Sequence, residues 1–434
     1  MTRWCPKIRS KSPTYLLGMI LSCTGVLCNE WVLTKLFSSD GALELDTRAQ
    51  IWFIDIGLIL LGFFLIWYSR WSSSVEALRY WQQNYPKTTA SAFGFGLLVV
   101  LLCSLELFFY ALNRIKADHS KVQESGMRFV RTEPLGYKNP PNTRAVERMS
   151  LNGREIFNVT YSTDGYSRRI TPLPHTGSVD KFILFFGCSY TFGQGVQDEE
   201  TLPSRVSKLA PNYRPYNYGV IGYGPQHVLI KLEDPSLKRE IEESHGILVY
   251  TYLHDHLYRV VGSLNHHGRE MPHYVLDSDG NLERAGDMVS GRPAIALLYW
   301  LFRKSSTAQF FQLGYPRIDD NDIRLTAKII IEARNAFSRL FDRGDFYVLM
   351  YPNPSSSARM KQLIPHFEGA KVKYLDYSEL FDPSTQGLRI EGDPHPTPKA
   401  YRWVAERLTR DIGLSAQTSY PARKAAGQTR RTRV

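Results

Sequence analysis

Two short segments of this chain carry residue types that could do nucleophilic chemistry together. In the stretch 182–195, an apolar run ends at Gly187, and Ser189 follows two residues later in a turn rich in glycine. A serine hydroxyl is a weak nucleophile unless a neighbouring base takes its proton. Asp393 and His395 stand together near the end of the chain, and an aspartate that orients a histidine ring supplies such a base. We therefore predict Ser189 as the nucleophile, His395 as the base and Asp393 as its orienting acid.

The order of these residues resembles that of the SGNH or GDSL hydrolases, in which the serine comes early and the aspartate and histidine come late. Gly187-Cys188-Ser189 stands where Gly-Asp-Ser is usual, and the resemblance covers residues 181–412. It implies a serine esterase or acyl transferase that works through an acyl-Ser189 intermediate. The implied substrates are small O-acyl esters, including acetyl groups on envelope polysaccharide, and no cofactor is expected.

The same resemblance implies an oxyanion hole, because acyl transfer needs donors where negative charge develops. The backbone N–H of Ser189 is one expected donor. The stretch 217–224 is similar to the family's second motif and makes Gly222 the expected donor glycine, since a residue without a Cβ allows close approach. His254 stands where the third motif has an asparagine, and its ring N–H is the third expected donor.

Two other functions stay open. His254, His256 and His266 lie in a histidine-rich region beside Asp255, and His-x-His is a spacing that metal ligands use. A metal-dependent hydrolase is one alternative, although no metal site is predicted. A non-catalytic SGNH-like protein that binds glycans is the other, because the family's asparagine is missing. Cys188 is expected to pack beneath the turn rather than to act as a nucleophile.

The elements that position these residues alternate between strands and helices, which predicts a three-layer, flavodoxin-like α/β domain with a parallel sheet. Neither the Gly-Lys-Ser/Thr of a phosphate-binding loop nor the Gly-x-Ser-x-Gly of the α/β-hydrolases is present. The predicted strands are Phe182–Phe186, Tyr213–Tyr218, Gly246–Leu253, Phe346–Tyr351 and Val372–Asp376. The predicted helices are Thr201–Leu209, Ile323–Phe341 and Pro398–Ile412, with a further helical stretch at Ala294–Arg303.

The first 113 residues are of a different kind, because three apolar stretches occur at Tyr15–Leu33, Ile51–Tyr68 and Ala90–Leu112. A bilayer crossing needs about 20 mostly apolar residues. The stretches therefore predict three transmembrane helices, in which Glu30, Asp55 and Glu106 are either interfacial or form a polar cluster. The distribution of Lys and Arg in the loops favours a cytoplasmic N-terminus, which makes this a multi-pass protein of the bacterial inner (cytoplasmic) membrane with an extracytoplasmic catalytic domain.

The chain is accordingly divided into a membrane region (1–113), a β-rich lead-in (114–180), an SGNH-like domain (181–414) and a disordered basic tail (415–434). The net charge of +11 lies partly at the two ends, and nucleic acid is not an expected partner on the outer side of a membrane. The expected partners are an ester-bearing small molecule or an acylated polysaccharide. Three spans are too few for an acyl-donor translocase, so an acetyl transferase would need a separate multi-span membrane partner.

Overall fold

The computed structural model describes residues 13–27, 55, 57–66, 83–84, 86–116, 121–173, 179–264, 270–311 and 316–414. The chain divides into two compact units, each made of segments that are distant in sequence. The first unit contains the described parts of 1–118, 261–269 and 288–319. The second contains the described parts of 119–260, 270–287 and 320–434. The predicted tail, 415–434, lies outside the described residues.

A five-stranded parallel sheet forms the centre of the second unit, as predicted. Its order is β12-β11-β8-β6-β7. Numbered along the chain this is the order 2-1-3-4-5 of flavodoxin-like folds, which reverses direction between the first and third strands. The strands are β6 (Lys181–Gly187), β7 (Tyr213–Gly219), β8 (His245–Tyr252), β11 (Asp345–Met350) and β12 (Lys373–Asp376).

The central position of β6 follows from its sequence. Phe182, Ile183, Leu184 and Phe185 are successive apolar residues, each no more than 1% exposed. A strand with helices on both of its faces has no solvent side, so it is apolar without alternation. The run 182–186 therefore specifies a strand in the middle of the sheet.

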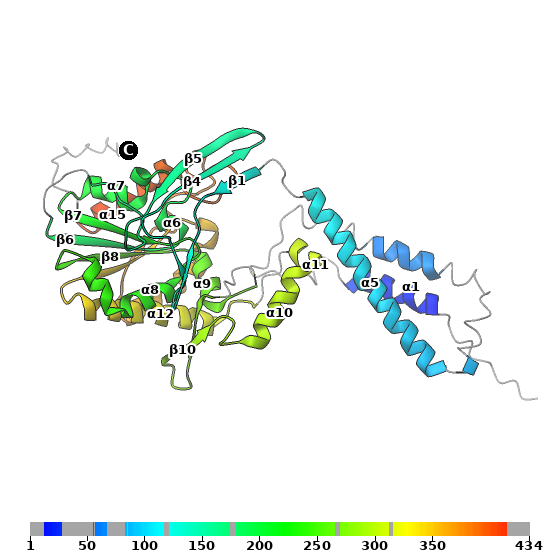
Figure 1. Cartoon of the computed structure of the whole chain (residues 1–434). Coiled ribbons are helices and arrows are strands. Elements are labelled where there is room, and N and C mark those ends of the chain that lie inside the picture. The colour runs from blue at the N-terminus through cyan, green and yellow to red at the C-terminus, as the bar shows by residue number, and fades with distance from the viewer. Residues whose placement is uncertain are drawn as a thin grey trace, which may run out of the picture. The chain divides into compact units, whose positions relative to one another are not determined.

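Helices cover both faces of this sheet and make three layers (Figure 1). α7 packs with α15, and α8 packs with α12 on the other face. The helices predicted at 201–209, 323–341 and 398–412 are confirmed. α8, which begins directly after a glycine-rich turn, was not predicted. These helices are α7 (Leu202–Leu209), α8 (Pro225–Glu233), α12 (Asp320–Leu340) and α15 (Pro398–Asp411), and the shorter ones are α6 (Ser189–Phe192), α9 (His254–Val261), α13 (Ser357–Lys361) and α14 (Ile364–Gly369).

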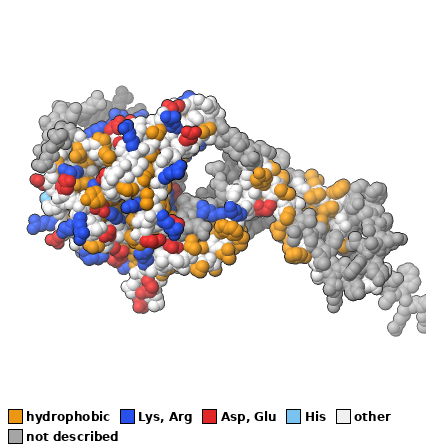
Figure 2. Space-filling view, in the orientation of Figure 1, with side chains coloured by type: hydrophobic (Ala, Val, Ile, Leu, Met, Phe, Trp, Pro, Cys, Tyr) orange, Lys and Arg blue, Asp and Glu red, His pale blue; other side chains and the backbone are white. Residues whose placement is uncertain are grey.

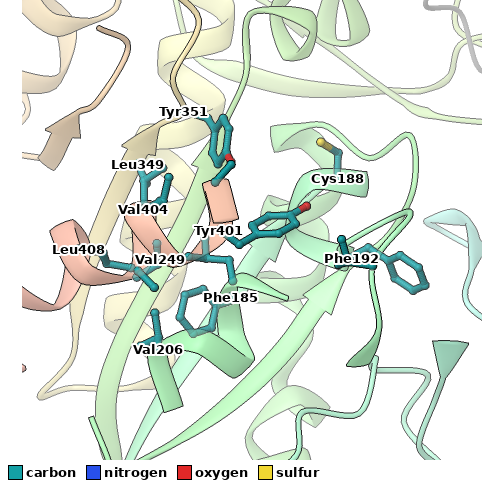
Figure 3. Packing of buried hydrophobic residues seen from close by; sticks show 14 of the residues in the cluster. Phe185, Cys188, Phe192, Val206, Val249, Leu349, Tyr351, Tyr401, Val404 and Leu408 are labelled. Atoms are coloured by element: carbon teal, nitrogen blue, oxygen red, sulfur yellow. The ribbon is translucent and has the colours of Figure 1, made fainter. Parts of the chain in front are cut away.

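The main hydrophobic cluster fills the space between the sheet and α15. Val404 and Leu408 of α15 belong to the same cluster as Phe185 and Val249 of the sheet (Figure 3). Thr397 begins α15, since its hydroxyl accepts from the Ala400 N–H at 3.3 Å and Pro398 occupies the first turn. The helix thus starts directly after the segment that contains His395.

The lead-in forms small antiparallel sheets in the second unit. β1, β4 and β5 make one sheet, β2 and β3 a second, and β9 and β10 form a separate hairpin. The strands are β1 (Lys121–Ser125), β2 (Val130–Thr132), β3 (Gly136–Lys138), β4 (Arg144–Leu151), β5 (Arg154–Ser162), β9 (Pro272–Leu276) and β10 (Leu282–Asp287). Met149 and Phe157 of this three-stranded sheet join the main hydrophobic cluster, so the lead-in shares the core of the α/β domain.

The first unit is helical where it is described. Its labelled helices are α1 (Pro13–Leu27), α5 (Pro86–Lys116), α10 (Pro293–Lys304) and α11 (Ser306–Phe310). Across the described ranges, no helix combines the length and the hydropathy needed to cross a bilayer, so the structure does not support the three predicted transmembrane helices. Parts of the first two apolar stretches, including Glu30, lie outside those ranges.

Candidate active site

Ser189 lies at the carboxyl end of β6, where the strand order of the parallel sheet reverses. It is the first residue of α6 and is 6% exposed. The turn requires glycine at 187, because φ there is +152° and a Cβ would lie 2.3 Å from Thr191 Oγ1. In open α/β sheets, ligands bind at this edge and at this reversal.

His395 and Asp393 form a buried pair. His395 Nδ1 lies 2.5 Å from Asp393 Oδ1, and the same oxygen accepts from the backbone N–H of His395 at 3.0 Å. Burial raises the pKa of the Asp393 carboxyl, but the hydrogen bonds from His395 and the nearby Lys121 ammonium outweigh burial, and the pKa is lowered overall. Asp393 therefore stays ionised and fixes the ring, with Nε2 left for a substrate or a nucleophile.

Tyr190 joins the turn that carries Ser189 to the His395–Asp393 pair. Its hydroxyl donates to the Pro394 carbonyl at 2.8 Å, and its ring centroid lies 5.4 Å from that of His395. The residue after Ser189 thus contacts the loop that carries His395 and Asp393. The structure brings the two predicted segments together, although 204 positions separate Tyr190 from Pro394.

The lead-in also holds the Asp393 loop. Lys121 of β1 donates to the Gly392 carbonyl at 2.9 Å, and its Nζ lies 3.7 Å from Asp393 Oδ2. Arg389 donates to the Asp393 carbonyl at 3.0 Å. Sequence reasoning did not find these cations, because neither lies in a recognisable motif.

Gly222 lies in the turn between β7 and α8, with φ of +87°. A Cβ there would lie 2.4 Å from Tyr137 Oη, so this conformation favours glycine. Within the described ranges its N–H has no hydrogen-bond acceptor, whereas Tyr223 donates to the Val220 carbonyl at 3.1 Å. His227 holds the end of the turn by accepting from the Gly224 N–H at 3.1 Å.

Asn217 and Arg169 support the segment that follows Ser189. Asn217 Nδ2 donates to the Thr191 carbonyl at 3.0 Å. Arg169, which is 1% exposed, pairs with Asp198 at 2.8 Å and donates to the carbonyls of Phe192, Gly193 and Val196. A single buried guanidinium therefore holds the chain just after Ser189, and its position in the turn-rich lead-in gave no signal of this role.

His254 follows β8 at the same edge of the sheet and begins α9. Its ring packs edge-on against Tyr258, with centroids 5.1 Å apart. The expected donors Ser189, Gly222 and His254 thus follow three adjacent strands, β6, β7 and β8.

The histidine cluster does not assemble a metal site in the part of the chain that is described. No group of three or more His, Cys, Asp or Glu side chains there is arranged to hold a metal ion. His256 lies in the core, where its Nδ1 is 2.7 Å from Tyr250 Oη and burial lowers its pKa well below the usual range. His266 lies outside the described residues.

Cys188 is fully buried and belongs to the main hydrophobic cluster, in agreement with a packing role (Figure 3). Arg259 of α9 hydrogen-bonds this side chain and donates to the Tyr223 carbonyl at 2.7 Å. Burial lowers the pKa of Arg259, but the interactions with Cys188 and Asp255 outweigh it, and the pKa is raised overall. A permanent positive charge therefore stands beside the turn that carries Ser189, which the sequence did not reveal because arginine is common on helices.

Comparisons with known proteins give structural likeness only. No family model and no curated protein matches the chain. Similar solved structures include a lipolytic protein of the G-D-S-L family from Veillonella parvula, with 15% identity, a TM-score of 0.32, and coverage of 54% of this chain and 97% of that one. An acetylxylan esterase from Geobacillus stearothermophilus is 9% identical, with a TM-score of 0.32 and coverage of 55% of this chain and 97% of that one. A lipase/acylhydrolase from Enterococcus faecalis is 12% identical, with a TM-score of 0.31 and coverage of 55% of this chain and 100% of that one.

Proposed function

We propose that this protein is a serine hydrolase of ester bonds. The observation that carries the proposal is the buried His395–Asp393 pair, connected through Tyr190 to the turn that presents Ser189. A nucleophile, a base and an orienting acid in this order are the parts that acyl transfer through a serine requires.

In the proposed reaction, Ser189 Oγ attacks the ester carbonyl while His395 Nε2 takes the hydroxyl proton. Asp393 stabilises the imidazolium that forms. The N–H groups of Ser189 and Gly222, with the His254 ring, receive the developing oxyanion. Collapse of the intermediate breaks the ester C–O bond, and His395 returns its proton to the leaving alcohol. Acyl-Ser189 remains and is cleaved in the second half-reaction.

The acceptor in that second half-reaction is water or a sugar hydroxyl, and we propose acetylated envelope polysaccharide as the natural substrate. The resemblance of the sequence motifs supports this finer proposal. Transfer to a sugar would require an acyl donor, which a separate multi-span membrane protein would supply. Turnover of p-nitrophenyl acetate with and without a glycan acceptor distinguishes the two reactions, since only transfer yields an acetylated glycan.

The nucleophile is tested in the full chain with a fluorophosphonate probe and p-nitrophenyl acetate. We expect Ser189→Ala to abolish both labelling and turnover, and Cys188→Ala to retain most of each, because only the Ser189 hydroxyl forms the acyl intermediate. Chelators should leave the wild-type rate unchanged. Activity in Ser189→Ala together with its loss in Cys188→Ala would reverse the assignment, and chelator-sensitive turnover would favour the metal alternative.

We also propose the extracytoplasmic location of the catalytic domain, on the Lys and Arg asymmetry of the N-terminal loops. A reporter that is active only outside the cytoplasm, fused after Leu414, should be active. An inactive reporter there, with an active cytoplasmic reporter at the same position, would overturn this location.

A further inference from the structure

α10, in the first unit, has an exposed surface that is unusually apolar. Among the described helices in the second half of the chain, it exposes the most large apolar side chains. Figure 2 shows hydrophobic side chains gathered over this helix, with Lys and Arg side chains beside them. Tyr299 is its buried residue, at 2% exposed. Six large apolar residues are between 41% and 61% exposed, namely Ile295, Leu297, Leu298, Trp300, Leu301 and Phe302.

These side chains lie in one arc around the helix, into which Lys304 falls at its C-terminal end. At about 100° per residue, they follow one another around the helix over about 220°. The order around the arc is Trp300, Leu297, Leu301, Leu298, Phe302 and Ile295. A helix on the surface of a water-soluble domain has the opposite arrangement, with a narrower apolar stripe that faces the core. A contiguous exposed patch of this kind marks an interaction surface.

Specific contacts hold the C-terminal end of α10, and α11 directly after it, within their unit. Glu106 of α5 accepts from Ser305 Oγ at 2.5 Å and from the Ser306 N–H at 2.6 Å, where α10 ends and α11 begins. Asn113 donates to the Ser306 carbonyl at 2.9 Å. Phe109 packs on Phe310, with ring centroids 4.7 Å apart. The apolar arc is therefore a fixed surface of the unit rather than the side of a loose segment.

The other helices of this unit are built in a way that suits a lipid environment. α1 approaches residues 57–66 so closely that a Cβ on Gly18 would lie 2.5 Å from the Gly62 carbonyl oxygen. Close backbone contact at small residues is typical of helix packing in membranes. α1 and α5 also expose large apolar side chains, which are Leu16, Met19, Ile20, Phe95, Leu98, Leu102, Leu107, Phe108 and Tyr110.

We propose that α10 lies in the interfacial plane of a lipid bilayer, with its apolar arc at the boundary between headgroups and acyl chains. Its 12 residues span about 18 Å, which is too short to cross a hydrocarbon core of about 30 Å but suits a helix that lies flat. Trp300 has the amphipathic ring that favours this depth. Arg303 and Lys304 are exposed at the end of the helix and complement anionic headgroups.

The test places a fluorescent label on the arc of the full-length protein. The five native cysteines are replaced by alanine, and Leu297→Cys or Leu301→Cys carries an environment-sensitive nitrobenzoxadiazole group. Glu283→Cys, at an exposed position on β10, is the matched control. Each protein is reconstituted into vesicles of phosphatidylcholine and phosphatidylglycerol with nitroxide quenchers placed near the headgroups or near the chain ends. Circular dichroism checks that each variant is folded.

We expect blue-shifted emission at 297 and 301, with stronger quenching by the shallow nitroxide than by the deep one, and water-like, unquenched emission at 283. Water-like emission at both arc positions would overturn the proposal. Blue-shifted emission without lipid quenching would also overturn it, since the arc would then be covered by a second copy or by another segment of this chain. Stronger quenching by the deep nitroxide would contradict the interfacial depth.

Discussion

Replacing Asp393 by asparagine tests the mechanism most directly, because the side chain keeps its shape and loses its charge. In the native protein, the ionised carboxylate faces the His395 ring from a site that is only 5% exposed. An imidazolium and a carboxylate whose charges are about 4 Å apart attract by about 4 kcal/mol at an effective dielectric constant of about 20. Since each 1.4 kcal/mol corresponds to about tenfold in rate, we expect kcat/KM to fall by about 10³.

The assay is turnover of p-nitrophenyl acetate by the full chain, together with the rate at which a fluorophosphonate labels Ser189. Both should fall together, because both need His395 to take the serine proton. Asp382→Asn is the matched control, since Asp382 is exposed and accepts a hydrogen bond from the Ser384 N–H at 2.8 Å in an ordinary turn. An Asp393→Asn protein with an unchanged Tm and a rate within tenfold of wild type would refute the proposed role of the carboxylate.

Three further predictions concern the groups around Ser189. His254→Ala should lower kcat by about 10²–10³ with little change in KM, because an oxyanion donor acts mainly in the transition state. His254→Asn should recover much of the lost kcat. An unchanged kcat in His254→Ala would exclude His254 as an oxyanion donor. Arg169→Met should lower the free energy of unfolding by about 3–5 kcal/mol in denaturant titrations, because it leaves the half-buried Asp198 without its ion pair and three carbonyls without their buried donor. A loss below 1 kcal/mol would mean that the network contributes little. Gly187→Ala should slow fluorophosphonate labelling of Ser189, because the new methyl group would displace Thr191 from the turn; an unchanged rate would show that the turn tolerates a side chain.

The sequence was sufficient to predict the centre of the domain because its signals are local. The buried run 182–186 specifies a central strand. The glycines after β6 and β7 indicate backbone conformations that other residues rarely adopt. Asp393 and His395 could be identified because they are two residues apart in one turn, so their side chains can meet without help from distant segments.

The contacts between segments distant in sequence could not be predicted in the same way. The Lys121–Gly392 hydrogen bond joins residues 271 positions apart, and the Glu106–Ser305 bond joins residues 199 positions apart. Such contacts produce no periodic pattern in the sequence of either segment, because a polar side chain that makes one cannot be distinguished from other polar side chains in turns. The helical stretch at Ala294–Arg303 was predicted, but nothing in its sequence indicated that it shares a unit with α5.

The long separation between Tyr190 and Pro394 has a consequence for synthesis of the protein. At the usual elongation rate of about 5–20 residues per second, a ribosome adds the 204 residues between them in about 10–40 s. During that interval the nascent chain carries Ser189 but has neither Asp393 nor His395. Under the proposed mechanism the chain therefore has no activated serine until residue 395 has been added, and any product that terminates before that residue is inert however well its sheet has formed.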